Sequence, residues 1–233
     1  MNTALSPQPA IQLENVHFAY RYGAPEILHL QSLNIQAGER IFVFGPSGSG
    51  KTTLLGILAG VLKASSGKVS ILNRDLTAMK PSGRDAFRAA HIGYIFQMFN
   101  LIPYLSVLEN ITLPCRLSVE RRLRLGGVAM NEAALRIATH LGIGEILNSN
   151  VSKLSVGQQQ RVAAARSLIG TPELVIADEP TSSLDHDHRE KFIQLLFAEC
   201  SQAGSTLVFV SHDRTLIPLF HRSISLPEIN EAS

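Results

Sequence analysis

The chain has 233 residues, of which 45% are hydrophobic and 17% are charged, with a formal net charge of +2. This length can bury a sizeable core, as one domain or as one domain with an inserted subdomain. The composition excludes a disordered or fibrous protein, and the small net charge gives no indication of binding to nucleic acid or to an anionic membrane.

The N-terminus lacks the basic region and apolar core of a signal peptide, and no apolar run approaches the roughly 18 to 20 residues that span a bilayer. We therefore expect a protein that is neither secreted nor inserted in a membrane by itself. Cys115 and Cys200 lie far apart without metal-ligand spacing, which predicts reduced thiols in a cytosolic protein. Residues 1–10, with two prolines and no clear period, are expected to form a flexible tail.

The predicted elements begin with a half-buried strand at 11–20 and continue with a strand, a glycine turn and a strongly apolar strand within 31–45. A helix is predicted at 50–62, a short strand within 65–75 and a helix at 81–90. From about 98 to 153 the patterns favour helices. Helix 156–169, strand 173–178, helix 187–202 and strand 206–212 follow. This alternation predicts an α/β fold with a largely parallel sheet, interrupted by a helical insertion.

The stretch "GPSGSGKTT" (45–53) matches the phosphate-binding pattern GxxxxGK[ST] through Gly45, Gly50, Lys51 and Thr52, between an apolar strand and a helix. Glycines let backbone N–H groups turn toward phosphate oxygens, and the helix N-terminus adds its positive dipole end. Lys51 offers a charge to the β- and γ-phosphates, and Thr52 offers a hydroxyl to Mg²⁺. The alternative is a glycine-rich turn without a ligand.

Acidic residues end the apolar strand in "ELVIADEP" (173–180), where open α/β sheets bind their ligands. Asp178 is placed to hold Mg²⁺, and Glu179 to polarise a water for attack on a γ-phosphate. The alternative is that both only cap the following turn. His212 ends a second apolar strand, where it would orient the γ-phosphate or serve a structural role.

These motifs, in this order, resemble the ATP-binding cassette (ABC) ATPases over residues 11 to about 226. The resemblance identifies Walker A at 45–53, the glutamine of "YIFQMFN" as Gln97, the signature "LSVGQ" at 154–158, Walker B at 174–179, the D-loop "SSLD" at 182–185 and the switch histidine as His212. It implies a P-loop NTPase fold of the ABC ATPase type. Such a fold has a mostly parallel RecA-like core and an N-terminal antiparallel β subdomain, which together take 11–97 and 156–233. Its inserted α-helical subdomain takes 98–155.

The resemblance also implies a head-to-tail dimer of this chain that holds two ATP, each between Walker A of one copy and the signature of the other. Glu179 and His212 would be catalytic, and Asp185 would cross the interface. Tyr20 would stack on adenine, with Tyr22 as a competitor. Thr52, Gln97 and Asp178 would hold Mg²⁺. The nucleotide-binding residues implied are Tyr20, Gly45, Pro46, Ser47, Gly48, Ser49, Gly50, Lys51, Thr52, Thr53, Gln97, Ser155, Gly157, Gln158 and Asp185.

The segments "IFQMFNLIPYLSVLENITLP" and "LSVGQQQRVAAARSL" are most similar to the branch with the MacB, LolD and FtsE ATPases. That branch implies a peripheral protein on the cytoplasmic face of the inner membrane, without a nucleic-acid partner, that drives membrane subunits in export or lipoprotein extraction. Residues 98–111 would contact those subunits, or would be ordinary core of the helical subdomain. An FtsE-like ATPase that signals without transporting a substrate is an alternative. A cassette of DNA repair or translation is disfavoured because 233 residues leave no room for long coiled coils or a second cassette. We also expect no C-terminal regulatory domain of the kind that some importers carry, because the chain stops soon after the strand that follows His212.

The signature departs from the family's usual LSGGQ, because Val156 replaces a glycine. Ser155 followed by Gln158 predicts a capping box, with Ser155 at the N-cap and Val156 at the first helical position. That position has ordinary helical dihedrals, so a valine there needs no positive φ. We therefore expect the site to be competent.

Overall fold

The structure is a computed structural model that describes residues 9–21, 23–182 and 186–232. The chain divides into two compact units, Met1–Asp85 with Thr206–Ser233 and Ala86–Ser205. The helical subdomain expected at 98–155 lies within the second unit, and its limits stay a prediction. Among the described residues, no helix is long and apolar enough to cross a membrane.

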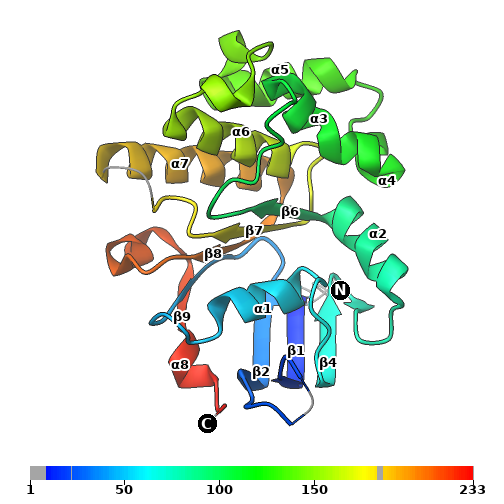
Figure 1. Ribbon diagram of the computed structural model, residues 1–233, viewed down its shortest axis with the longest axis vertical. Helices are drawn as coiled ribbons and strands as arrows, with labels where there is room; N and C mark the ends of the chain where they lie inside the picture. The colour runs from blue at the N-terminus through cyan, green and yellow to red at the C-terminus, as the bar shows by residue number, and fades with distance from the viewer. Residues whose placement is uncertain (1–8, 22, 183–185, 233) are drawn as a thin grey trace, which may run out of the picture. The chain divides into compact units, whose positions relative to one another are not determined.

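The first unit contains an antiparallel sheet with the strand order β2-β1-β4-β5, part of which is visible in Figure 1. Its strands are β1 (Pro9–Phe18), β2 (Leu28–Gln36), β4 (Ser66–Ile71) and β5 (Arg74–Asp75). The alternating burial of β1 and β2 fits a sheet with one face on the core. β1 begins at Pro9, and Ala10 is buried, so the last two residues of the expected tail 1–10 belong to this strand. Residues 1–8 lie outside the described part.

Three parallel strands complete the first unit: β3 (Arg40–Phe44) pairs with β8 (Thr206–Val210) on one side and with β9 (Arg222–Ser225) on the other. The middle residues of β3 are buried, as is typical of a parallel strand covered on both faces, and the strongly apolar strand predicted within 31–45 is confirmed. The helical pieces are α1 (Lys51–Leu58), the 3₁₀ helix η3 (Arg214–Leu219) and α8 (Leu226–Ile229). Helix α2 (Pro81–His91) starts in this unit and confirms the helix expected from Pro81.

The second unit contains two parallel strands, β6 (Ile92–Ile95) and β7 (Leu174–Asp178). Its helices are α3 (Val107–Leu117), α4 (Val119–Leu123), α5 (Met130–His140), α6 (Val156–Leu168) and α7 (His186–Ala203), with 3₁₀ turns η1 (Gly144–Ile146) and η2 (Val151–Lys153). Helix α6 packs against α3 and α5, and these helices lie together in Figure 1. The segment 98–153 is therefore helical, as predicted, and strand β6 was not foreseen.

Both cysteines, Cys115 and Cys200, are buried thiols, in agreement with the expectation of reduced cysteines.

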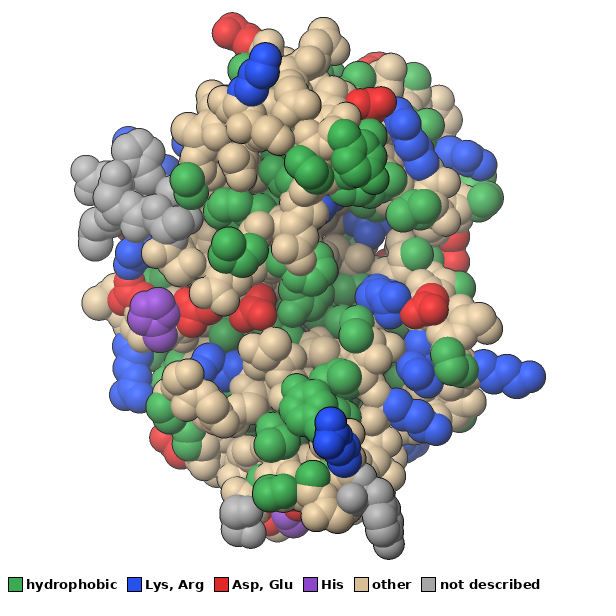
Figure 2. Space-filling model, viewed as in Figure 1, with side chains coloured by type: hydrophobic (Ala, Val, Ile, Leu, Met, Phe, Trp, Pro, Cys, Tyr) green, Lys and Arg blue, Asp and Glu red, His purple; other side chains and the backbone are tan. Residues whose placement is uncertain are grey.

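Figure 2 shows small groups of hydrophobic side chains at one surface of the molecule. Among the described residues of the second unit, the most exposed large hydrophobic side chains are those of Met98 and Tyr104, each with an exposed fraction of 80%. Both lie in the segment between β6 and α3.

Candidate nucleotide-binding site

The loop between β3 and α1 is a glycine cradle. Gly48 and Gly50 have φ of 81° and 94°, in the left-handed region that favours glycine. A Cβ at Gly50 would lie 2.8 Å from a methyl of Leu28, and one at Gly45 would lie 2.7 Å from Ser49 Oγ, so the loop excludes side chains at both positions. Helix α1 has no side-chain cap at its N-terminus, and Ser49 Oγ is buried without a partner. The N–H groups of the first turn and this hydroxyl therefore suit an anion.

Lys51 places a positive charge on this loop. Its Nζ donates hydrogen bonds to the carbonyl oxygens of Gly45 and Pro46, both at 2.8 Å. The next residue, Thr52, is exposed in the first turn of α1, where its hydroxyl is accessible. The cradle thus carries the Lys51 ammonium and the Thr52 hydroxyl beside uncapped backbone donors, which is the chemistry that a nucleoside triphosphate with Mg²⁺ requires.

Tyr20 lies beside the same helix. Its hydroxyl is 3.2 Å from Thr53 Oγ1, and its ring meets Phe18 edge-on at a centroid distance of 5.0 Å. The side chain nonetheless keeps an exposed fraction of 63%, which leaves ring surface for stacking. Tyr22, the competing candidate, lies outside the described residues.

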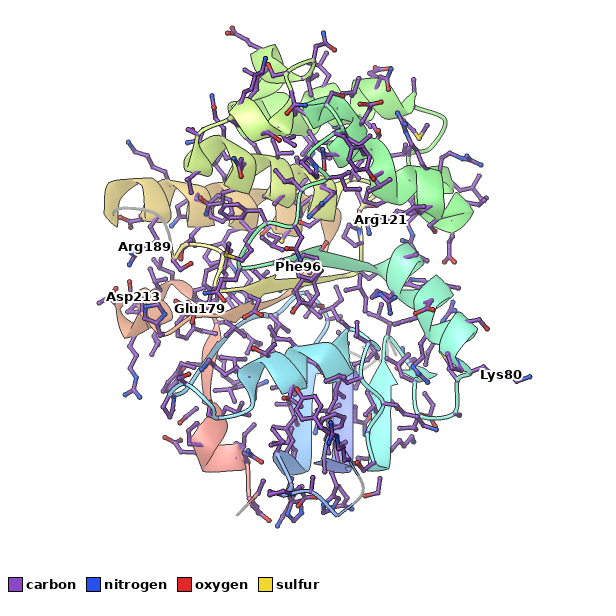
Figure 3. The ribbon with its side chains drawn as sticks, viewed as in Figure 1. Lys80, Phe96, Arg121, Glu179, Arg189 and Asp213 are labelled. Atoms are coloured by element: carbon purple, nitrogen blue, oxygen red, sulfur yellow. The ribbon has the colours of Figure 1, made fainter. Side chains whose placement is uncertain are left out.

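His212 and the cradle follow paired strands. Val43 of β3 is opposite Val210 of β8 in a parallel register, so Gly45 and His212 both come two residues after a paired position, at one edge of these strands. The His212 side chain is exposed. Asp213, which is labelled in Figure 3, fixes the next turn, because its carboxylate accepts a hydrogen bond from the N–H of Thr215 at 3.1 Å.

In the second unit, Gln97 and the two acids, Asp178 and Glu179, lie at the same end of the paired strands β6 and β7. Ile95 of β6 is opposite Ala177 of β7, so Gln97 and Glu179 both come two residues after paired positions. The Gln97 side chain is exposed, and those of Asp178 and Glu179 are half-buried. Figure 3 marks Glu179 beyond the end of β7. Oxygen ligands from Gln97 and Asp178 fit a magnesium ion.

Glu179 has a strained backbone. Its φ of 46° is in the left-handed region, which is unfavourable for a residue with a side chain. Near the same strand end, burial and the charge of Asp178 raise the pKa of Tyr94 above its usual range. Tyr94 therefore stays protonated and neutral beside these acids at physiological pH.

The signature stretch forms the N-terminus of α6, and the capping box predicted there is confirmed. Ser155 Oγ accepts from the N–H of Gln158 at 3.3 Å, and the Gln158 side chain accepts from the N–H of Ser155 at 3.0 Å. Val156 is the first helical residue, its φ is not positive, and its side chain has an exposed fraction of 50%. The valine is therefore accommodated without backbone strain.

The signature helix is also joined to the turn that follows Glu179. Gln160, which is fully buried, donates from Nε2 to the carbonyl oxygen of Pro180 at 2.6 Å. A displacement of the signature helix would therefore move the turn that directly follows Asp178 and Glu179.

Residues 28–182 match the family model described as "ABC transporter". The chain belongs to this ABC transporter family. YbbA of Escherichia coli, an uncharacterized ABC transporter ATP-binding protein, is 41% identical over 194 residues, with 83% of each chain covered. The lipoprotein-releasing system ATP-binding protein LolD of Bacteroides fragilis is 36% identical, with 90% of this chain and 94% of LolD covered. Among solved structures, the dimeric ATP-binding cassette MJ0796 bound to ADP and Pi matches with a TM-score of 0.82 at 36% identity, covering 92% of this chain and 93% of that one.

The family, the fold and the ATPase activity expected from the sequence are thus confirmed, and this ABC ATPase is an ATP-binding subunit. The D-loop residue Asp185 lies outside the described residues. The roles of the individual site residues stay predictions, supported by the geometry described above.

The sequence reasoning missed two buried arginines of this ABC ATPase. Arg166 of α6 donates to the carbonyl oxygens of Phe99 at 2.5 Å and Asn100 at 2.7 Å, and so holds the loop that follows Gln97. Arg121 of α4, which is labelled in Figure 3, donates to the carbonyl oxygens of Ile169 at 2.7 Å and Ile92 at 2.9 Å, and also to the carbonyl oxygen of Ser167.

Burial lowers the pKa of Arg121 to about 10, so it remains charged at neutral pH. A signal for Arg166 was available, since it interrupts the small apolar run "VAAARSL".

Proposed function

We propose that this ABC ATPase hydrolyses MgATP between two copies of itself and drives integral membrane subunits. The observation that carries the proposal is the cradle at 45–50, where side-chain-free loop positions, the uncapped N-terminus of α1 and the Lys51 ammonium suit a triphosphate. Tyr20 stacks on the base, and Lys51 and the loop amides bind the phosphates. Thr52, Gln97 and Asp178 would hold the magnesium ion, which would neutralise phosphate charge when bound.

Glu179 has the role of general base in this proposal. Its carboxylate accepts a proton from the attacking water, and His212 orients the γ-phosphate. The left-handed backbone at Glu179 supports this role, because such strain persists where the surrounding structure holds a side chain in a required direction.

The dimer of the proposal places the signature of one copy against the nucleotide of the other. A similar cassette has been solved as a dimer bound to ADP and Pi, which supports this arrangement. The exposed start of α6, with the Ser155 hydroxyl and the small Gly157, offers a hydroxyl and close backbone approach to a phosphate. In this arrangement Asp185 lies at the interface between the copies.

A membrane partner is proposed to bind the first part of segment 98–111. Met98 and Tyr104 are both highly exposed there, and such side chains are enriched at protein interfaces. Asn110 pins the segment, because its side chain exchanges hydrogen bonds with Ile102 N and Ile102 O at 2.8 and 3.1 Å. Val107 and Ile111 are buried, so the end of the segment belongs to the core, as the alternative interpretation expected.

The similarity to LolD supports lipoprotein extraction or export as the coupled process, carried out at the cytoplasmic face of the inner membrane. The macrolide export ATP-binding/permease protein MacB of Syntrophobacter fumaroxidans is also 36% identical to this chain. That match includes 93% of this chain but 30% of MacB.

The catalytic part is tested with Glu179→Gln. This variant should bind ATP with unchanged affinity and lose at least about a hundredfold in steady-state turnover, because general-base catalysis contributes 10²–10⁴-fold. Glu173→Gln, which removes a carboxylate before the other end of β7, is the matched control and should keep wild-type turnover. Equal activities of the two variants would contradict the role of Glu179.

The membrane part is tested by purifying the chain from detergent-solubilised membranes of its own organism, with intensity-based mass spectrometry of the co-purified proteins. An integral membrane protein in stoichiometric amount is expected, and Met98→Ser with Tyr104→Ser should release it. Recovery of the chain without any such protein would remove the coupling to membrane subunits from the proposal.

A further inference from the structure

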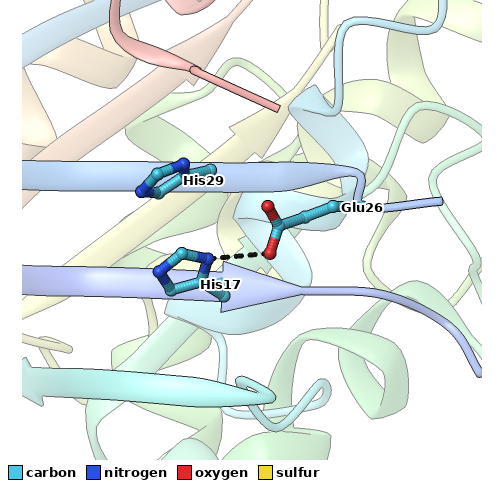
Figure 4. Close-up of side chains that lie close together, drawn as sticks. All are labelled: His17, Glu26 and His29. Carbon is cyan, nitrogen blue, oxygen red and sulfur yellow. Dashed lines mark hydrogen bonds and ion pairs between the residues drawn. The ribbon is translucent and has the colours of Figure 1, made fainter. Parts of the chain in front are cut away.

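A cluster of metal-binding side chains lies in the antiparallel sheet of the first unit. His17 of β1 and His29 of β2 are direct cross-strand partners, and Glu26 comes two residues before β2 (Figure 4). One ligand atom from each of the three lies within 4.8 Å of the others. Their side chains have exposed fractions of 34% for His17, 35% for Glu26 and 28% for His29, so an ion from solution can reach them.

The geometry of the cluster is compact. His17 Nδ1 lies 2.8 Å from Glu26 Oε1, and the two imidazole rings stack with centroids 4.1 Å apart and an interplanar angle of 24°. In tetrahedral zinc sites the bond lengths of about 2.0–2.2 Å place ligand atoms about 3.3 Å from one another. Small rotations of these half-exposed side chains are therefore enough to bring all three to one ion.

The C-terminal segment brings a candidate fourth ligand, a carboxylate oxygen, toward the cluster. Asn230 accepts from the N–H of His29 at 2.8 Å and donates to the carbonyl oxygen of Ile27 at 3.0 Å. The N–H of Glu231 donates to the carbonyl oxygen of His29 at 2.9 Å, and Glu231 Oε2 lies 3.8 Å from His29 Nδ1. The backbone thus holds a carboxylate beside the second histidine.

We propose that His17, Glu26 and His29 form a binding site for a divalent transition-metal ion of the Zn²⁺ type, with Glu231 or water in the fourth position. Two imidazoles and a carboxylate suit Zn²⁺, Ni²⁺ or Co²⁺, whereas Mg²⁺ and Ca²⁺ prefer oxygen ligands alone. The site is separate from the residues proposed to hold Mg²⁺, and it does not depend on the proposed function.

The ion would cross-link the loop that joins β1 to β2 to both strands. This loop closes through the hydrogen bond from Ile27 N to Phe18 O at 2.8 Å, and it carries Tyr20. An ion that joins Glu26 to both strands adds a second closure to the same loop. The metal would therefore stabilise the folded chain without taking part in ATP hydrolysis.

The test uses the full chain without an affinity tag and without nucleotide. Titration with ZnCl₂ by calorimetry should give one ion per chain, and elemental analysis after desalting should give the same stoichiometry. A hundredfold excess of Zn²⁺ over Kd should raise the Tm by about 5–10 °C, whereas Mg²⁺ should leave it unchanged.

The variants decide between this site and adventitious binding. His17→Gln with His29→Gln should abolish the stoichiometric binding, and Glu26→Gln should weaken it at least tenfold. The matched control is His140→Gln, since His140 forms an isolated pair with Glu199 at 2.9 Å and should not affect binding. If the double variant does not fold, His29→Gln alone gives the same readout. Unchanged zinc stoichiometry in the His17 and His29 variants, or an equal loss in His140→Gln, would overturn the proposal.

Discussion

Val156→Gly restores the glycine of the usual signature, and the structure predicts that this change has little effect. Val156 is the first residue of α6 and follows a complete capping box, so the helix start does not depend on its side chain. With half of its surface exposed, it contributes little burial. The remaining difference is the helix propensity of glycine against valine, about 0.5 kcal/mol or less. Converted at about 1.4 kcal/mol per tenfold, this corresponds to at most about a twofold change in ATPase rate.

The assay is steady-state ATP hydrolysis at saturating MgATP, together with urea unfolding of the same variant. Val119→Gly is the matched control, because Val119 is also exposed at the first position of a helix whose N-cap is a serine, Ser118. Both variants should lose a similar few tenths of a kcal/mol in unfolding free energy. A tenfold gain in turnover for Val156→Gly alone would show that the valine restrains the enzyme, and would refute the reasoning from local geometry.

Lys51→Ala should weaken ATP binding at least about tenfold, since a hydrogen bond to a charged group contributes about 1.5–3 kcal/mol, and unchanged affinity for a fluorescent ATP analogue would contradict the role of the cradle. Arg121→Met should lower the unfolding free energy by about 3 kcal/mol, because three carbonyl oxygens lose a buried donor at about 1–3 kcal/mol each and the methionine recovers part of the loss. The exposed Arg122→Met is its control in urea unfolding, and a loss under about 1 kcal/mol for Arg121→Met would contradict this estimate. Burial raises the pKa of Glu173, but its contacts with His91 and Arg124 together lower the pKa by more than burial raises it, so the net pKa is below the usual 4.5. The Glu173 carboxylate therefore stabilises the fold above about pH 4.5, and this stabilisation is lost as the pH falls through the lowered pKa. Glu173→Gln should lower the unfolding free energy by under about 1 kcal/mol at pH 7 and should not change it below the lowered pKa, as measured by urea unfolding at a series of pH values.

The sequence predicted those helices and strands that have a long hydrophobic period or a recognisable capping residue at one end. The start of α2 at Pro81 and the capping box of α6 follow from local chemistry, and both are confirmed. Strand β6 was missed because its four residues follow α2 without any turn residue between them. Two of the four residues of β9 are exposed and no apolar alternation marks this strand, so its bounds could not be predicted from the pattern.

The candidate site could be located from motifs, whereas its supporting contacts could not. The short run "VERRLRL" gives no sign that Arg121 is buried, while Arg122, its neighbour, is exposed. The left-handed backbone at Glu179 is likewise invisible in the sequence, since glutamate rarely adopts it. The cluster of His17 and His29 depends on the register of β1 with β2, and the loop that joins these strands is longer than the two-residue hairpin loops whose turn type fixes a register.

In the proposed dimer, ATP is bound between two copies of the chain, and the signature of each copy acts on the neighbour's nucleotide. The most direct test compares Glu179→Gln with Glu179→Gln combined with Gly157→Asp, by light scattering of the eluted peak in MgATP. The first should run at twice the 25.3 kDa of one chain. The second should remain a monomer that still binds ATP, because a carboxylate at the signature repels the neighbour's phosphate. A monomer for the first variant, or a dimer for the second, would contradict the account.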